Sequence, residues 1–226
     1  MLHLEFSSFG LRRRAVVHRN AAQSFLKVIA MHVKTPRIKL TVPNMLTLFR
    51  IVLIPILVVT FYLPFKGANL VAAGMFAIGA ITDWLDGWIA RRFGQMSAFG
   101  AFLDPVADKL TVTVTLFLLV QADPDPLMAV VSAIIVGREI TISALREWMA
   151  QIGERSKVNV AALGKFKTIL QMVAIVILLW RQPLENLPQL YEVGQVLLGI
   201  AAVLTIWSAV LYLRAAWPAM KRDQSE

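Results

Sequence analysis

Residues 83–108 read DWLDGWIARRFGQMSAFGAFLDPVAD and hold four aspartates in sequence apolar enough to be buried in a membrane. On a helix, Asp83 and Asp86 share one face, because three residues make nearly one turn. Asp104 and Asp108 are four residues apart and share one face of a second helix. Polar and glycine residues between the two pairs are typical of a tight turn. The stretch therefore predicts two antiparallel helices whose acidic faces meet in one pocket.

Four carboxylates this close cannot all stay ionised in a low dielectric without a positive counter-charge. A divalent cation with oxygen ligands, Mg²⁺ or Mn²⁺, is the simplest one. Four carboxylates outnumber what one Mg²⁺ usually takes from protein, so we expect two metal ions. Helix capping or a surface position is the ordinary alternative for aspartate, but an ionisable residue in a membrane segment marks a functional site by default.

Small residues continue the two acidic faces. Gly87, Ala90 and Arg91 follow on the face of Asp83, and Gly100 precedes Asp104 by one turn. Without side-chain bulk, this wall can receive something flat or extended, and Arg91 can meet a phosphate. Close packing between helices is the alternative explanation for the small residues, and it is compatible with the first.

The pattern D-x-x-D-G-x-x-A-R, then eight residues, then G-x-x-x-D-x-x-x-D resembles the signature of the CDP-alcohol phosphatidyltransferases at every fixed position. Further matches resemble the bacterial phosphatidylglycerophosphate synthases of that family, from about Pro43 nearly to the end of the chain. They are Pro-Asn-x-Leu-Thr-x-x-Arg at 43–50, Arg-Glu-Ile at 138–140 and Gly-Lys-x-Lys-Thr at 164–168.

The composition is that of an integral membrane protein, since 58% of the 226 residues are hydrophobic. We predict an all-α protein with six transmembrane helices, each with an apolar run near the roughly 20 residues that a span needs. The spans are expected to begin near residues 44, 69, 98, 127, 164 and 193, and the last to end near residue 213. No cysteine occurs, and all three histidines lie before residue 41, which excludes thiolate chemistry and histidine metal sites in the membrane body.

The positive charge is concentrated at the N-terminus. Residues 1–40 hold eight Lys or Arg against one acid, Glu5, which accounts for +7 of the net +9. We therefore expect a basic tail or amphipathic juxtamembrane segment over 1–42, a six-helix domain over 43–217 and a polar basic tail over 218–226. An anionic membrane surface is favoured over nucleic acid as the partner of this tail.

A polar strip opens the first predicted span. Asn44, Thr47 and Arg50 recur every three residues and so share a helix face near one membrane surface. The resemblance implies that this strip borders the active site, with Asn44 and Thr47 at the CDP group. The alternative is a helix cap together with an arginine that reaches the lipid headgroups.

Basic residues interrupt the fourth and fifth predicted spans. Arg138 and Arg146 are eight residues apart, on one helix face, and are spaced like two donors for one anion. The resemblance implies that Lys165 and Lys167 help to hold the phosphate of the acceptor. Anchoring of the fifth span by positive charges on the cytoplasmic side is the alternative for the lysines.

The distribution of Lys and Arg predicts both termini and the charged site on the cytoplasmic side. The resemblance implies a multi-pass protein of the bacterial cytoplasmic (inner) membrane, and commonly a homodimer. It also implies transfer of a phosphatidyl group from CDP-diacylglycerol to glycerol 3-phosphate with release of CMP. We expect Asp108, the last acid on its helix face, to be the general base for the glycerol hydroxyl.

The expected sites are assigned as follows. The metal ligands are Asp83, Asp86, Asp104 and Asp108; the CDP group meets Gly87, Ala90, Arg91, Gly100, Asn44 and Thr47; the acceptor phosphate meets Arg138, Arg146, Lys165 and Lys167.

Other functions remain open from sequence alone. The acceptor could be serine, inositol phosphate or another phosphatidyl lipid, although the basic residues favour a phosphorylated one. Intramembrane acids also occur in ion-coupled transporters and cation channels, but crowding of the acids at one membrane face argues against that class. A noncatalytic membrane scaffold would predict that Asp108→Asn leaves every activity unchanged.

Overall fold

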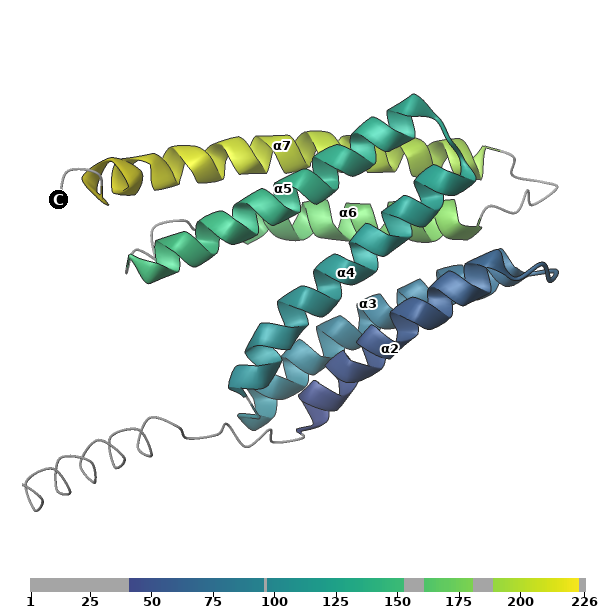
Figure 1. Cartoon of the computed structure of the whole chain (residues 1–226), viewed down its shortest axis with the longest axis horizontal. Coiled ribbons are helices and arrows are strands. Elements are labelled where there is room, and N and C mark those ends of the chain that lie inside the picture. The colour runs from purple at the N-terminus through teal and green to yellow at the C-terminus, as the bar shows by residue number, and fades with distance from the viewer. Residues whose placement is uncertain (1–40, 96, 153–160, 181–188, 224–226) are drawn as a thin grey trace, which may run out of the picture. The chain divides into compact units, whose positions relative to one another are not determined.

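The computed structural model describes residues 41–95, 97–152, 161–180 and 189–223. Within these ranges every regular element is a helix, so the predicted all-α architecture is confirmed. The predicted basic segment at residues 1–40 lies outside the described residues. The helices are α2 (Val42–Tyr62), α3 (Ala68–Phe93), α4 (Ala98–Ala122), α5 (Pro126–Gln151), α6 (Ala161–Trp180) and α7 (Leu190–Asp223) (Figure 1).

The turn between α3 and α4 follows from two residues of the sequence. Gly94 ends α3 in the left-handed region, with φ of +64°, where glycine pays no steric penalty. Ser97 begins α4, and its Oγ accepts a hydrogen bond of 2.9 Å from the backbone N–H of Gly100. The chain therefore reverses between the two acidic pairs, as predicted.

Helix α2 packs along both α3 and α4, whereas α3 and α4 contact each other little and diverge from their turn (Figure 1). The two acidic faces were expected to meet in one pocket, and their four carboxylates do gather, but around a side chain of α2 that sequence periodicity did not place there. Sequence periodicity gives the polar face of each helix but does not say which third helix will cover it.

Helices α5, α6 and α7 form the other part of the bundle, in which α7 packs against both α5 and α6. Contacts between α3 and α6 join the two parts. Fully buried alanines, such as Ala72 on α3, Ala174 on α6 and Ala201 on α7, allow close approach of the helix backbones. Phe76 of α3 and Leu178 of α6 belong to the same hydrophobic core.

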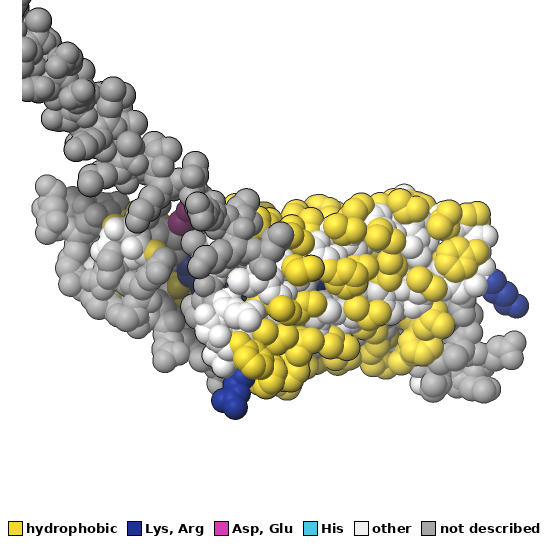
Figure 2. All heavy atoms as spheres, turned by 90° about the horizontal axis from the view of Figure 1, so that it is seen from below, with side chains coloured by type: hydrophobic (Ala, Val, Ile, Leu, Met, Phe, Trp, Pro, Cys, Tyr) yellow, Lys and Arg dark blue, Asp and Glu magenta, His cyan; other side chains and the backbone are white. Residues whose placement is uncertain are grey.

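The outer surface of the helices is hydrophobic, and Figure 2 shows a broad apolar face with basic side chains near its ends. By length and composition, α2, α3, α5 and residues Leu190–Pro218 of α7 can each cross a membrane. Helix α6 contributes a shorter apolar stretch, Phe166–Trp180. The sequence predicts six spans, and for α4 and α6 that assignment stays a prediction.

Helix α7 is longer than the last predicted span, which was expected over residues 193–213. It runs from Leu190 to Asp223, 34 residues in all. Hydropathy marks the part of a helix that lipid can cover, whereas backbone hydrogen bonds continue into the polar residues beyond it.

Candidate active site

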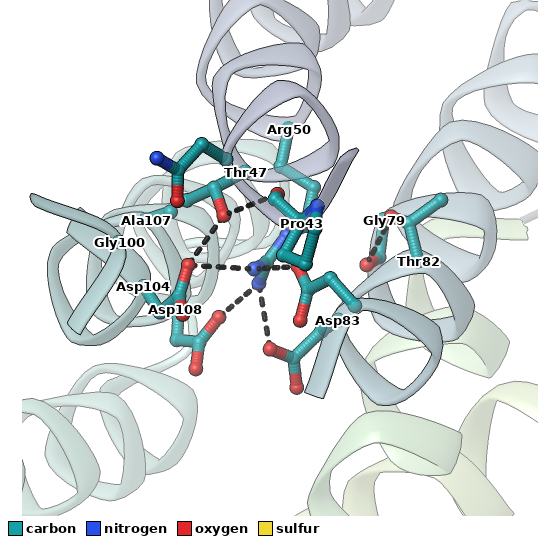
Figure 3. A network of polar contacts seen from close by, with 12 residues as sticks. Pro43, Thr47, Arg50, Gly79, Thr82, Asp83, Gly100, Asp104, Ala107 and Asp108 are labelled. Atoms are coloured by element: carbon teal, nitrogen blue, oxygen red, sulfur yellow. Dashed lines mark hydrogen bonds and ion pairs between the residues drawn. The ribbon is translucent and has the colours of Figure 1, made fainter. Parts of the chain in front are cut away.

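The guanidinium of Arg50, on the third turn of α2, is the centre of a network of carboxylates (Figure 3). Its Nη1 bonds to Asp83 Oδ1 at 2.8 Å and also to Asp108 Oδ1. Its Nη2 bonds to Asp86 Oδ2 at 2.6 Å and lies 3.8 Å from Asp104 Oδ1. All four aspartates of the signature therefore gather around one cation, and we call them the carboxylate cluster.

Arg50 itself is buried, with only 3% of its side chain exposed. An arginine that reaches lipid headgroups would extend away from the bundle, so that alternative for Arg50 is excluded. The positive charge of Arg50 instead forms ion pairs with several carboxylates inside the protein, and these offset the cost of its desolvation. The spacing of the polar residues over 44–50 indicated that Arg50 lies on a polar helix face. Local spacing could not predict that Arg50 would contact acids of both α3 and α4.

The four carboxylates differ in their access to solvent. The Asp86 side chain is 3% exposed and closes the inner side of the cluster. The side chains of Asp83, Asp104 and Asp108 are 42%, 37% and 41% exposed. Three of the four acids are therefore partly accessible to solvent, so a charged ligand can reach them.

The donor set of this cluster consists only of carboxylate oxygens, which are the ligands that Mg²⁺ and Mn²⁺ prefer. By donor chemistry, the cluster fits a hard divalent cation. The guanidinium of Arg50 occupies the centre of the cluster. Among the described residues, no group of three acidic or histidine side chains is arranged around a single metal position.

Two residues of the first turns of α2 hold the start of α4. The Thr47 hydroxyl lies 3.1 Å from the Pro43 carbonyl oxygen and bonds to Asp104 Oδ1. Ser97 Oγ donates to Asn44 Oδ1 at 2.9 Å. Asn44 and Thr47 were predicted at the CDP group, and both are buried. The contacts described for them position the signature helix.

Gly100 lies against this same turn of α2. A methyl group at Gly100 would overlap the amide oxygen of Asn44 and would come within 3.1 Å of Ser97 Oγ. A side chain at position 100 would therefore displace the Asn44 amide or push α4 away from α2. This is the packing explanation for the small residue, and it holds whether or not a ligand also contacts the wall.

Gly87, Ala90 and Arg91 extend along α3 from the carboxylate cluster toward its C-terminus. The Arg91 guanidinium folds back over Gly87, with Nη1 3.4 Å from the position of a Cβ there. The Ala90 carbonyl accepts the backbone N–H groups of Gly94 and Gln95, which end the helix. These residues form a partly exposed strip beside the acids.

A second charged group lies between α5, α6 and α7. Arg138 Nη1 donates to Glu139 Oε2 at 3.1 Å, and Lys167 Nζ lies 3.9 Å from the same oxygen. Arg146 lies over the ring of Tyr212, 5.3 Å from its centroid. Both arginines are near enough to Lys167 to repel its ammonium group. We call Arg138, Arg146 and Lys167 the cation cluster.

The structure brings together most of the basic residues that the sequence predicts at the acceptor. Lys167 is 4% exposed, so it faces the protein and is not a surface anchor to lipid. Lys165 lies on α6, but its side chain lies outside the described part of the chain. Glu139, which links Arg138 to Lys167, was not predicted as a site residue.

A sequence model of the CDP-alcohol phosphatidyltransferase family matches residues 40–207. The chain belongs to this family. The matched range includes both halves of the signature and all three residues of the cation cluster. It ends at Trp207, before the last turns of α7.

Individual relatives agree with this membership. A protein of Salmonella choleraesuis (strain SC-B67) is 52% identical over 175 residues, which are 77% of this chain and 94% of the relative. A protein of Yersinia pestis (strain Pestoides F) is 52% identical over 180 residues, which are 79% of this chain and 96% of the relative. Both are named CDP-diacylglycerol–glycerol-3-phosphate 3-phosphatidyltransferase.

Proposed function

We propose that this family member transfers a phosphatidyl group from CDP-diacylglycerol to sn-glycerol 3-phosphate, giving phosphatidylglycerophosphate and CMP. Relatives at 52% identity are named for this substrate pair. The observation on the chain itself that carries the proposal is the occurrence of both a cluster of four carboxylates and a separate cluster of three cations. Figure 1 shows the turn between α3 and α4 and the end of α5 at the same side. A diphosphate donor and a phosphorylated acceptor need these two kinds of site.

In the proposed reaction a hydroxyl oxygen of glycerol 3-phosphate attacks the phosphorus that bears the diacylglycerol. The bond from this phosphorus to the CMP oxygen breaks, and CMP leaves. Asp108 takes the hydroxyl proton as general base. Its bond to Arg50 uses Oδ1, and its side chain is partly exposed, so the hydroxyl can reach this carboxylate.

Two divalent cations, Mg²⁺ or Mn²⁺, would supply the positive charge that offsets the diphosphate when they are bound. The proposed ligands are the members of the carboxylate cluster, Asp83, Asp86, Asp104 and Asp108. Arg50 contacts all four of these side chains, so the proposed ligands already lie close to one another.

The cytidine diphosphate group is proposed to bind at the strip formed by Gly87, Ala90 and Arg91. This strip is adjacent to the acids and carries little bulk, and the exposed Arg91 guanidinium can turn from Gly87 toward a phosphate. Asn44, Thr47 and Gly100 support the same site from α2 and α4.

The proposed acceptor site consists of Arg138, Arg146, Lys165 and Lys167. A phosphate dianion that enters beside a diphosphate needs several fixed cations, because the two ligands repel each other. A phosphorylated acceptor therefore fits this site better than serine does.

We further propose six membrane spans, with α4 and α6 added to the four helices that qualify by composition. The expected setting is the bacterial cytoplasmic membrane with the site facing the cytoplasm. Basic residues 1–42 would contact anionic lipid, and the enzyme would be a homodimer.

The direct test is incubation of the purified full-length protein with CDP-diacylglycerol, Mg²⁺ and labelled glycerol 3-phosphate. We expect CMP release together with label in the lipid phase. Serine and inositol phosphate are assayed in parallel as acceptors, and faster transfer to either would reassign the substrate. No CMP release with any acceptor would favour an ion transporter, the second class that intramembrane acids suggest.

A further inference from the structure

Two side chains of α7, Ser208 and Tyr212, contact the two arginines of the cation cluster. They are four residues apart and therefore on one face of α7. Their partners on α5, Arg138 and Arg146, are eight residues apart and also on one face. Each arginine of α5 thus has its own partner on α7.

Ser208 receives a hydrogen bond from Arg138 in a fixed direction. Arg138 Nη2 donates to Ser208 Oγ at 2.9 Å. The single hydroxyl proton of Ser208 is donated to the Thr205 carbonyl oxygen, also at 2.9 Å, which directs an oxygen lone pair toward the arginine. Ser208 is 4% exposed, so water does not compete for this bond. The guanidinium is therefore held at both Nη atoms, by Glu139 on one side and Ser208 on the other.

Tyr212 holds Arg146 by the face of its ring. The guanidinium carbon lies 5.3 Å from the ring centroid, a cation–π distance. The ring cannot turn freely, because it is packed among Ile142, Leu145 and Met149 of α5. Arg146, although exposed, is thereby kept close to the bundle.

We propose that Ser208 and Tyr212 are positioning residues that hold Arg138 and Arg146 in the orientation that receives the phosphate of the acceptor. The inference rests on the proposed function, because it assumes that the cation cluster binds this phosphate. It gives α7 a role in the affinity for the acceptor. Both residues lie beyond residues 40–207, the range matched by the family model. Neither residue touches substrate.

The test is steady-state kinetics on the full-length enzyme, with glycerol 3-phosphate and CDP-diacylglycerol varied in turn. In Ser208→Ala we expect the KM for glycerol 3-phosphate to rise about tenfold, because hydrogen bonds to charged groups are stronger than neutral ones. The KM for CDP-diacylglycerol stays within about twofold of wild type. Partial loss of folded enzyme lowers kcat and leaves KM unchanged, so a merely structural role for Ser208 would not give this result.

The matched control is Ser132→Ala on α5. Ser132 is as buried as Ser208, and its hydroxyl has no hydrogen-bond partner among the described residues. In Ser132→Ala the KM for glycerol 3-phosphate and the KM for CDP-diacylglycerol are both expected to equal those of wild type. If Ser208→Ala gives the same pair of values as this control, or raises both KM values equally, the inference is wrong.

Tyr212 is tested by two substitutions that separate its ring from its hydroxyl. Tyr212→Phe keeps the ring face and should keep the wild-type KM for glycerol 3-phosphate. Tyr212→Leu removes the ring and should raise that KM about fivefold. Equal KM values in the two variants would contradict the role of the ring.

Arg138→Gln distinguishes a failure of this inference from a failure of the proposed acceptor site. If Arg138→Gln raises the KM for glycerol 3-phosphate and Ser208→Ala does not, only the role of α7 is wrong. If Arg138→Gln leaves that KM unchanged, the assignment of the cation cluster to the acceptor is wrong as well.

Discussion

The carboxylate cluster and the cation cluster differ in how the protein compensates their charge. Arg50 contacts all four aspartates, so four negative charges meet one positive charge and a net −3 remains if all are ionised. In the cation cluster, three positive charges meet the single carboxylate of Glu139, and a net +2 remains. An internal counter-ion therefore orders each site without neutralising it. The remaining charge is negative in the carboxylate cluster and positive in the cation cluster, opposite in each case to the charge of the proposed ligand.

The largest expected effect comes from the carboxylate cluster and would separate chemistry from binding. Asp108→Asn removes the proposed base and one proposed metal ligand, so we expect kcat to fall by about 10²–10⁴. CMP release from CDP-diacylglycerol is the measurement. Glu147→Gln, at an exposed acid of α5, is the control and should retain wild-type kcat. Full activity of Asp108→Asn would make the carboxylate cluster a structural feature only.

The internal counter-ion can be removed directly. Arg50→Met leaves four carboxylates without a cation, and the loss of one partner of a buried ion pair costs about 3–5 kcal/mol. We expect a lower melting temperature in EDTA, and a larger rise on addition of Mg²⁺ than in wild type, because the metal then supplies the missing charge.

Arg92→Met, at an exposed arginine of α3, is the control for this loss of charge and should melt as wild type does in both buffers. If Arg50→Met also melts as wild type does in EDTA, Arg50 does not organise the four acids. If its response to Mg²⁺ equals that of wild type, metal and guanidinium do not act on the same carboxylates.

The cation cluster is expected to act on affinity alone. In Lys167→Gln we expect the KM for glycerol 3-phosphate to rise by about 10- to 100-fold, since hydrogen bonds to charged groups contribute about 1.5–3 kcal/mol. The KM for CDP-diacylglycerol is expected to stay the same, and Arg92→Gln should change neither value. A rise confined to CDP-diacylglycerol would reverse the assignment of the two clusters.

The smallest expected effect concerns packing beside the carboxylate cluster. Gly100→Ala inserts a methyl group against the Asn44 amide and should lower stability by about 1–3 kcal/mol. Gly74→Ala, where the added methyl group meets no atom within 4 Å, should be neutral or stabilising by up to about 1 kcal/mol. Thermal unfolding in detergent compares the two, and equal melting temperatures would show that the contact between Gly100 and Asn44 does not limit stability.

Sequence predicted the helices and the gathering of the acids well, because both depend on local signals. Gly94 and Ser97 mark the turn between α3 and α4, and the spacing of the aspartates places each pair on one face. The central position of Arg50 was not predicted. It depends on how α2 is rotated against α3 and α4, which packing over separations of 33 to 58 residues decides.

The cation cluster was predicted less completely for the same reason. The spacing of Arg138 and Arg146 indicated a shared face, but nothing local indicated that Ser208, 70 residues away, would accept a hydrogen bond from Arg138. A single serine in an apolar helix carries no periodic signal. Glu139 is adjacent to Arg138, and only the approach of Lys167 on α6 shows why an acid lies there.

The apolar outer surface of the helices has a consequence for how the enzyme meets its donor. A lipid substrate reaches such a protein by lateral diffusion within the bilayer, so its effective concentration is a number of molecules per unit area. Dilution of vesicles at constant lipid composition leaves that density unchanged, whereas dilution of CDP-diacylglycerol with inert lipid lowers it. Saturation by the donor should therefore follow its mole fraction, while saturation by glycerol 3-phosphate follows ordinary volume concentration.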